Sequence, residues 1–149
     1  MRRALIAALA AVLSGAGASA QEPGPKETFL IVTGAGVVPL QLEIADEPAE
    51  RSQGLMFRRE LAPRAGMLFD FGTTGPITMW MKNTLIPLDM LFVDAGGRIV
   101  GIARETVPRS LDTISSGQPV RAVIEIAGGA AAELGIAEGD LVARPLFAD

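Results

Sequence analysis

Short stretches of alternating apolar and polar residues, separated by turns rich in glycine and proline, fill most of the chain. Alternation with a period of two is typical of β-strands that bury one face. In residues 37–44, for example, Leu40, Leu42 and Ile44 point to one side and polar residues point to the other. The same pattern predicts strands at residues 28–33, 37–44, 66–71, 77–81, 88–93, 98–103, 119–127 and 141–144.

Helical signals are few and short. Residues 46–53 predict one helix, with Asp46 or Glu47 as its N-cap and Pro48 in its first turn. Residues 130–134 predict one or two further helical turns. Because no helix of 10–15 residues separates the strands, a parallel α/β sheet is excluded. We therefore expect a mainly β, compact single domain: a β-sandwich or partly closed barrel of about eight short strands with two short helices.

The first twenty residues follow a different pattern. Arg2 and Arg3 precede an apolar run at residues 4–13, and small residues of the A-x-A type follow at 18–20. This order is typical of a secretory signal peptide. The apolar run is too short to span a bilayer, which requires roughly 20 residues.

Domain organisation follows from that pattern. We expect a signal peptide at residues 1–20, cleavage near Ala20–Gln21, a flexible lead-in at residues 21–27 and one β-rich domain at residues 28–149. The mature protein is then periplasmic or secreted.

Composition narrows the chemistry. The chain has no Cys and no His, which excludes Ser–His and Cys–His catalysis and the usual Zn and Cu(II) sites. A net charge of −4 without a basic run argues against nucleic acid as a partner. We expect no metal, no cofactor and no membrane span, and we expect a monomer whose partner is a small polar ligand or a protein of the cell envelope.

Residues 77–94 concentrate the unusual side chains, including the only Trp and half of the six Met. Two predicted strands, 77–81 and 88–93, are joined here by the short segment 82–87. Such a connection is short enough to return the chain on itself, so the pattern predicts a β-hairpin.

The register of that hairpin predicts a site. If Met81 lies opposite Leu88, then Trp80 lies opposite Asp89, and Lys82 shares their face. The three side chains would form a polar and aromatic patch at the mouth of the hairpin.

Two interpretations remain open for each polar residue of this patch. Asp89 is a general base or a ligand acceptor, or it forms a structural pair with Lys82 or an arginine. Lys82 and Asn83 present donors to a carboxylate or a sugar hydroxyl, or they only form the loop, where Asn tolerates left-handed geometry.

Arg51 and Arg58 are the remaining candidates for ligand binding. They lie seven residues apart and share one side if the helix continues through Gly54. Arginine suits bidentate recognition of an anion. The alternative is a solvated helix face or ion pairs with Glu50 and Glu60.

Four motifs, in order along the chain, resemble the bacterial and archaeal domain-of-unknown-function 192 family. They are Arg51-x-x-Gly54-Leu55-Met56-x-Arg58-x-x-Leu61, Gly66-Met67-Leu68-Phe69-x-Phe71, Trp80-Met81-Lys82-Asn83-Thr84-x-Ile86-Pro87-Leu88-Asp89, and Glu125-Ile126-Ala127-Gly128 through Gly139-Asp140. The resemblance implies a compact β-rich fold like a sandwich, and it carries no established activity.

Three functions therefore remain in view. The favoured one is a small exported binding or accessory domain that recognises a small polar ligand or a partner at the Trp80–Asp89 hairpin mouth. The alternatives are a metal-free hydrolase or lyase that uses Asp89 with Lys82 or an arginine, and a purely structural interaction module. Handling of Cu(I) by methionine is a weaker fourth, because Met79 and Met81 have the spacing of core residues.

Overall fold

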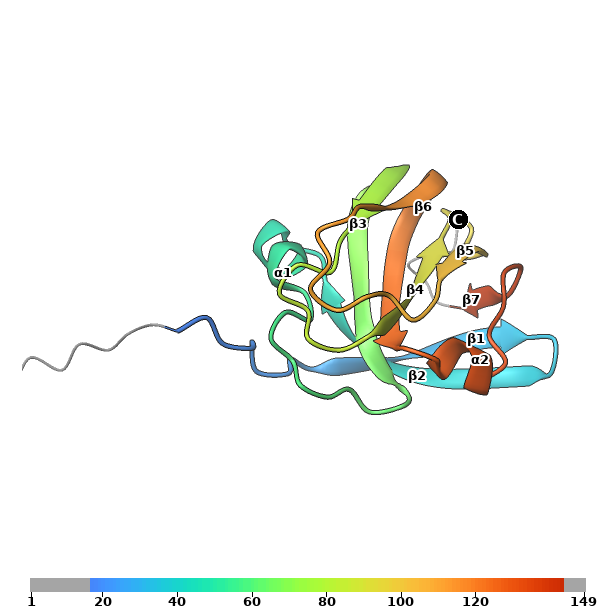
Figure 1. Ribbon diagram of the computed structural model, residues 1–149. Coiled ribbons are helices and arrows are strands. Elements are labelled where there is room, and N and C mark those ends of the chain that lie inside the picture. Colours follow the sequence, from blue (N-terminus) through green and yellow to red (C-terminus); the bar gives the residue numbers. More distant parts are fainter. Residues whose placement is uncertain (1–16, 144–149) are drawn as a thin grey trace, which may run out of the picture.

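The computed structural model describes residues 17–143, in which one sheet of seven strands curves round on itself (Figure 1). The elements are β1 (Lys26–Thr33), β2 (Gly36–Ala45), α1 (Pro48–Gln53), β3 (Ala65–Met79), β4 (Leu88–Val93), β5 (Ile99–Ala103), β6 (Ile114–Ala127), α2 (Ala130–Glu133) and β7 (Leu141–Ala143). The mainly β fold predicted from the alternation is confirmed, with two short helices and a single domain.

The sheet is nearly closed into a barrel. Its strand order is β5-β4-β6-β3-β2-β1-β7, and all neighbours are antiparallel except β2 and β3. The two outer strands meet at an isolated bridge between Arg98 and Leu141. There the backbone N–H of Ile99 donates to the carbonyl of Asp140 at 2.9 Å. Closure pairs strand ends that would otherwise be exposed edges.

Two apolar cores lie on the two faces of this sheet. The first fills the barrel, because every strand contributes to it, and Ala130 and Ala131 of α2 close one end. The second lies on the outer face of β3, β4 and β6, where Leu55, Phe69 and Met81 are among its buried residues. Side chains along β4 alternate between the two cores: Leu91 and Val93 face the first, and Met90 and Phe92 face the second.

Strand β3 is longer than the alternation predicts. It joins the strands expected at residues 66–71 and 77–81 through residues 72–76, which were expected to form a loop. Irregularities in its pairing with β6, between Asp70 and Gly75 and between Pro76 and Thr78, accommodate the glycine-rich part. The domain therefore has seven strands instead of eight.

The predicted hairpin is wrong. Strand β4 pairs with β5 and β6, and the end of β3 pairs with β6 alone. Met79 lies beside Ile114 at the start of β6, whereas Leu88 lies beside Ala127 at its end. Residues 80–87 consequently form a crossover along the outer face of β6, because β3 and β4 both run antiparallel to that strand.

The N-terminal segment was expected to be a signal peptide followed by a flexible lead-in. The expected signal peptide falls mainly on residues 1–16, which lie outside the described residues. Residues 17–25 precede β1 without helix or strand, and the N–H of Gly24 donates to Glu43 at 3.0 Å. Within residues 17–143, no helix is long and apolar enough to cross a membrane.

Candidate functional site

A pocket of about 340 Å³ opens on the outer face of the barrel, between α1, β3 and the crossover. Its walls are largely apolar, and they include Leu55, Met56, Phe69, Phe71 and Met79. Seven polar side chains also line it: Arg51, Ser52, Gln53, Thr78, Lys82, Thr84 and Glu125. Pro48, Gly54 and Trp80 complete the lining.

Glu125 is the buried acid of this pocket. It projects from β6 and is only 4% exposed, with Met67 of β3 and Met90 of β4 directly opposite on either side. In the described part of the chain, its carboxyl group has neither a hydrogen-bond donor nor a cationic partner. Burial raises the pKa of Glu125 to about 8. The side chain is therefore a neutral acid at pH 7, able to donate one hydrogen bond and to accept others.

Gln53 brings a second unpaired group to the same pocket. Its Nε2 atom is buried, and no acceptor for it lies among residues 17–143. Gln53 is the last residue of α1, and Gly54 follows it with a φ of +48°. A Cβ atom at Gly54 would lie 2.9 Å from the ring of Phe69, so only glycine lets the helix end approach the sheet this closely.

The start of α1 is fixed by a capping box. Glu50 accepts hydrogen bonds from the backbone N–H groups of Asp46 and Glu47, each at 3.2 Å. Asp46 and Glu47 were the expected cap residues, and Glu47 is the N-cap in the structure. This capping sets the orientation of the helix that carries Arg51 and Gln53.

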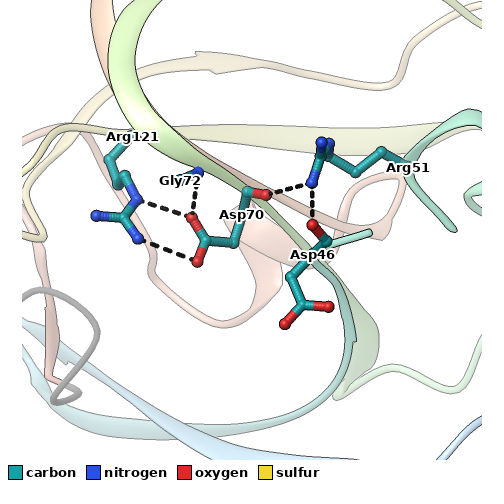
Figure 2. Close-up of polar contacts among 5 residues, drawn as sticks. All are labelled: Asp46, Arg51, Asp70, Gly72 and Arg121. Carbon is teal, nitrogen blue, oxygen red and sulfur yellow. Dashed lines mark hydrogen bonds and ion pairs between the residues drawn. The ribbon is translucent and has the colours of Figure 1, made fainter. Parts of the chain in front are cut away.

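Arg51 forms no ion pair with a carboxylate in the described residues, although its charge contributes to lowering the pKa of Asp70 (Figure 2). Its Nη1 donates to the backbone carbonyls of Asp46 and Asp70, the latter at 2.9 Å. The guanidinium also lies 5.6 Å from the centroid of the Phe71 ring. Neither of the ion pairs considered from the sequence, with Glu50 or Glu60, forms.

The carboxylate of Asp70, next to Phe71 in the sequence, already has hydrogen-bond partners other than Arg51. Asp70 accepts two hydrogen bonds from Arg121, at 2.7 and 3.1 Å, and one from the N–H of Gly72 at 2.8 Å (Figure 2). The pairing with Arg121, outweighing the effect of burial, lowers the pKa of Asp70. Arg51 is therefore left with donors free for a ligand.

Trp80 and Lys82 lie together at the pocket mouth. The Nζ atom of Lys82 is 5.0 Å from the centroid of the Trp80 ring, and the indole is 47% exposed. Lys82 is also exposed. Trp80 and Lys82 of the predicted patch therefore lie together in the structure, whereas Asp89 does not join them.

Asp89 lies elsewhere, on the opposite face of the sheet from Glu125. It is fully buried, and its carboxylate accepts the backbone N–H groups of Glu105 at 2.8 Å, Gly129 at 3.1 Å and Ala131 at 2.9 Å. The donors predicted from the sequence, Lys82, the loop N–H groups of Asn83 and Thr84, and the arginines, are not its partners. The reason is the strand order, since β4 lies beside β6 and not beside β3.

Arg58 and Asn83 also do not line the pocket. Arg58 forms a buried bidentate pair with Glu43, at 2.8 and 2.9 Å. Asn83 has a φ of +54°, and its carbonyl accepts the N–H of Phe57 at 2.8 Å, so it supports the crossover as a turn residue. The structure therefore brings Arg51, Trp80 and Lys82 to one site, and it separates Arg58, Asn83 and Asp89 from it.

Sequence reasoning did not select Glu125 or Gln53 as site residues. A signal for Glu125 exists, because it is the one acidic residue within the apolar strand at 119–127. Gln53 offers no comparable signal, since a glutamine at the end of a short helix is ordinarily solvated.

The chain belongs to the family described as DUF192, "Uncharacterized ACR", whose model matches residues 30–143. A crystal structure of a "putative transcription regulator" from Sinorhizobium meliloti 1021 is similar, with 44% identity and a TM-score of 0.77 over 85% of this chain and 96% of that one. A protein of unknown function from Novosphingobium aromaticivorans DSM 12444 has 39% identity and a TM-score of 0.79, over 87% and 94% of the two chains. A comparison with curated proteins finds no match.

The hydrogen bonding of Asp89 generates a stability prediction. Asp89→Ala leaves three N–H groups around α2 and Glu105 without an acceptor, and we expect it to lower the free energy of unfolding by about 3 kcal/mol or more. Asp112→Ala, at an exposed site, is the matched control and should change it by less than about 0.5 kcal/mol. Urea melts of the two variants measure the difference, and equal midpoints would contradict the assignment.

Glu125 generates a prediction of pH dependence. Its pKa is 4.5 in the unfolded reference and about 8 when folded, so the folded protein retains a proton that the unfolded chain loses in this window. Stability should therefore be full below about pH 4.5 and fall as pH rises towards 8. Glu125→Gln removes this loss. We expect the free energy of unfolding of the variant at pH 8 to be higher than that of the wild type by on the order of 3 kcal/mol. Denaturant melts at pH 5 and 8 test this.

The matched control for that measurement is Glu138→Gln, because Glu138 is exposed. Its pH profile should follow that of the wild type. A wild-type profile that is flat between pH 5 and 8 would show that the carboxyl group of Glu125 is hydrated or paired in solution.

Proposed function

We propose that this protein is a small binding domain that holds a small polar ligand in the outer pocket beside Trp80. The observation that carries the proposal is that the buried acid Glu125, which has no hydrogen bond or ion pair in the described residues, lines one pocket together with the unpaired Gln53 Nε2. Buried polar groups in native proteins are nearly always hydrogen-bonded, because leaving them unpaired costs roughly 1–3 kcal/mol each. A ligand that bonds to both would recover this free energy.

The shape and lining of the pocket agree with this proposal. A volume of about 340 Å³ lies within the range of small-molecule sites, roughly 300–1,000 Å³. Such sites combine apolar walls with convergent polar groups, and this lining has both. The site is displaced from the one expected at a hairpin mouth, but Trp80 and Lys82 belong to both.

The alternatives considered from the sequence receive less support. A hydrolase based on Asp89 lacks a free base, because all of its described partners are backbone N–H groups that hold α2 and the loop at Glu105. Asp89 and Glu125 also face opposite sides of the sheet, so they do not form a carboxylate pair. Met67, Met81 and Met90 are buried in the second core, where packing accounts for them.

We propose further that the protein acts outside the cytoplasm after removal of residues 1–20, on the strength of the charged, apolar and small-residue pattern at the N-terminus. Mass spectrometry of the protein purified from an expressing bacterium should find Gln21 at its N-terminus in the periplasmic fraction. Recovery of the intact chain, starting at Met1, from the cytoplasm would contradict export.

Ligand binding can be followed through Trp80, which is the only tryptophan. In a panel of small acids, amides, amines, sugars and short peptides, we expect a binder to change the indole fluorescence saturably and to raise the melting temperature. Amide NMR shifts should cluster at Gln53, Trp80 and Glu125. A binder whose shifts cluster elsewhere, or a panel without any binder, would contradict the proposed pocket.

The variant that tests the same pocket is Gln53→Leu, which keeps the size of the side chain but removes the unpaired donor. It should weaken a binder found in this way by roughly tenfold, as expected for one lost hydrogen bond in a buried site. The control Gln118→Leu changes a glutamine that bonds to Val100 away from the pocket, and it should leave the affinity unchanged.

A further inference from the structure

The pocket is lined by charged side chains of both signs. Besides Glu125, the charged side chains that line the pocket are Arg51 from α1 and Lys82 from the crossover. The residues opposite Glu125 on the adjacent strands, Met67 and Met90, are uncharged. No hydrogen bond or ion pair joins Glu125 to Arg51 or Lys82 in the described residues, and burial raises the pKa of Glu125.

The end of the pocket at Glu125 suits a neutral group. The protonated carboxyl of Glu125 offers one O–H donor and a carbonyl acceptor, and Gln53 Nε2 offers N–H donors. A carboxamide or another carbonyl-bearing group complements this set, because it can accept from both donors and, if it is an amide, donate in return. A second carboxylate at this end would face an acid that burial already keeps from ionising.

The end at Arg51 and Lys82 suits an anion. The Nη1 atom of Arg51 is engaged with two backbone carbonyls, which hold the guanidinium in place without neutralising it. Lys82 rests on the indole of Trp80 and has no carboxylate partner in the described part of the chain. Lys82, which has no carboxylate partner among the described residues, and Arg51, whose described hydrogen bonds all go to carbonyl groups, favour an anionic group over a cationic one at this pocket.

We propose that the ligand of this pocket is a small organic carboxylate with a neutral carboxamide or carbonyl group at its far end. The carboxylate interacts with Arg51 and Lys82, the neutral group bonds to Glu125 and Gln53, and an apolar body lies between Phe69, Phe71 and Trp80. This inference rests on the proposed binding function and specifies its ligand class.

The test uses ω-carbamoyl carboxylates of graded length and shape: succinamate, adipamate and 4-carbamoylbenzoate. Each is compared with the corresponding diamide, which lacks the charge, and with 4-amidinobenzoate, which has a cationic far end. Titrations at pH 7, followed by Trp80 fluorescence and amide NMR shifts, should give the tightest binding for at least one carbamoyl carboxylate, about tenfold or more above its diamide.

Two variants separate the two ends. Lys82→Glu should weaken the binding of the carboxylate at least tenfold while leaving the diamide unchanged. The control Lys26→Glu reverses the charge of the other lysine, which is exposed and outside this pocket, and should have no effect. Arg51 is not used for this purpose because it also ties α1 to β3 through backbone carbonyls.

The pH profile distinguishes a neutral far end from a cationic one. For a carbamoyl carboxylate, affinity should be constant below about pH 8 and fall up to tenfold per unit above it, as Glu125 loses its proton. Glu125→Gln should still bind and should abolish this fall. Affinity that rises with pH through this range would show that the ligand stabilises ionised Glu125, and would overturn the neutral assignment.

The titrations also distinguish a wrong ligand class from a wrong binding function. If diamides or amidines shift the pocket resonances while the carbamoyl carboxylates do not, the pocket binds ligands but the ligand class is wrong. If no probe shifts them, both the ligand class and the binding function are wrong.

Discussion

The site depends on one topological constraint, which is that residues 80–87 must cross over β6. Because β3 and β4 both run antiparallel to β6 and lie on its two sides, residues 80–87 must pass along its outer face. That passage and α1 cover a surface that would otherwise be open to water. The second core, the burial of Glu125 and the pocket beside Trp80 all follow from this covering.

Two buried acids on the same sheet differ in how their polar groups are satisfied. Asp89 and Glu125 belong to adjacent strands but point to opposite faces. On the inner face, Asp89 satisfies three backbone N–H groups and so fixes α2 to the barrel. On the outer face, Glu125 has no such partner in the described residues and bears the cost of desolvation, which is the feature on which the proposed site rests.

Local structure could be predicted from the sequence, whereas strand pairing could not. Alternation and turn residues identify β1, β2 and α1 within a few residues of their bounds. The proximity of Trp80 and Lys82 follows from their separation of two in an extended segment. A connection of six residues, however, looks the same whether it turns a hairpin or crosses a neighbouring strand, and only the insertion of β6 decides between them. That Gln53 and Glu125 line one pocket depends on that insertion, so it could not be predicted from sequence spacing.

The most direct measurement is the ionisation of Glu125 itself. Its side-chain carboxyl carbon can be followed by 13C NMR as pH is varied, with Glu125→Gln to assign the signal. This account predicts a midpoint near 8, because the group is buried and has no partner in the described residues. A midpoint near 4.5 would mean that water or a cation reaches the carboxylate, and it would contradict both the neutral acid and the site built around it.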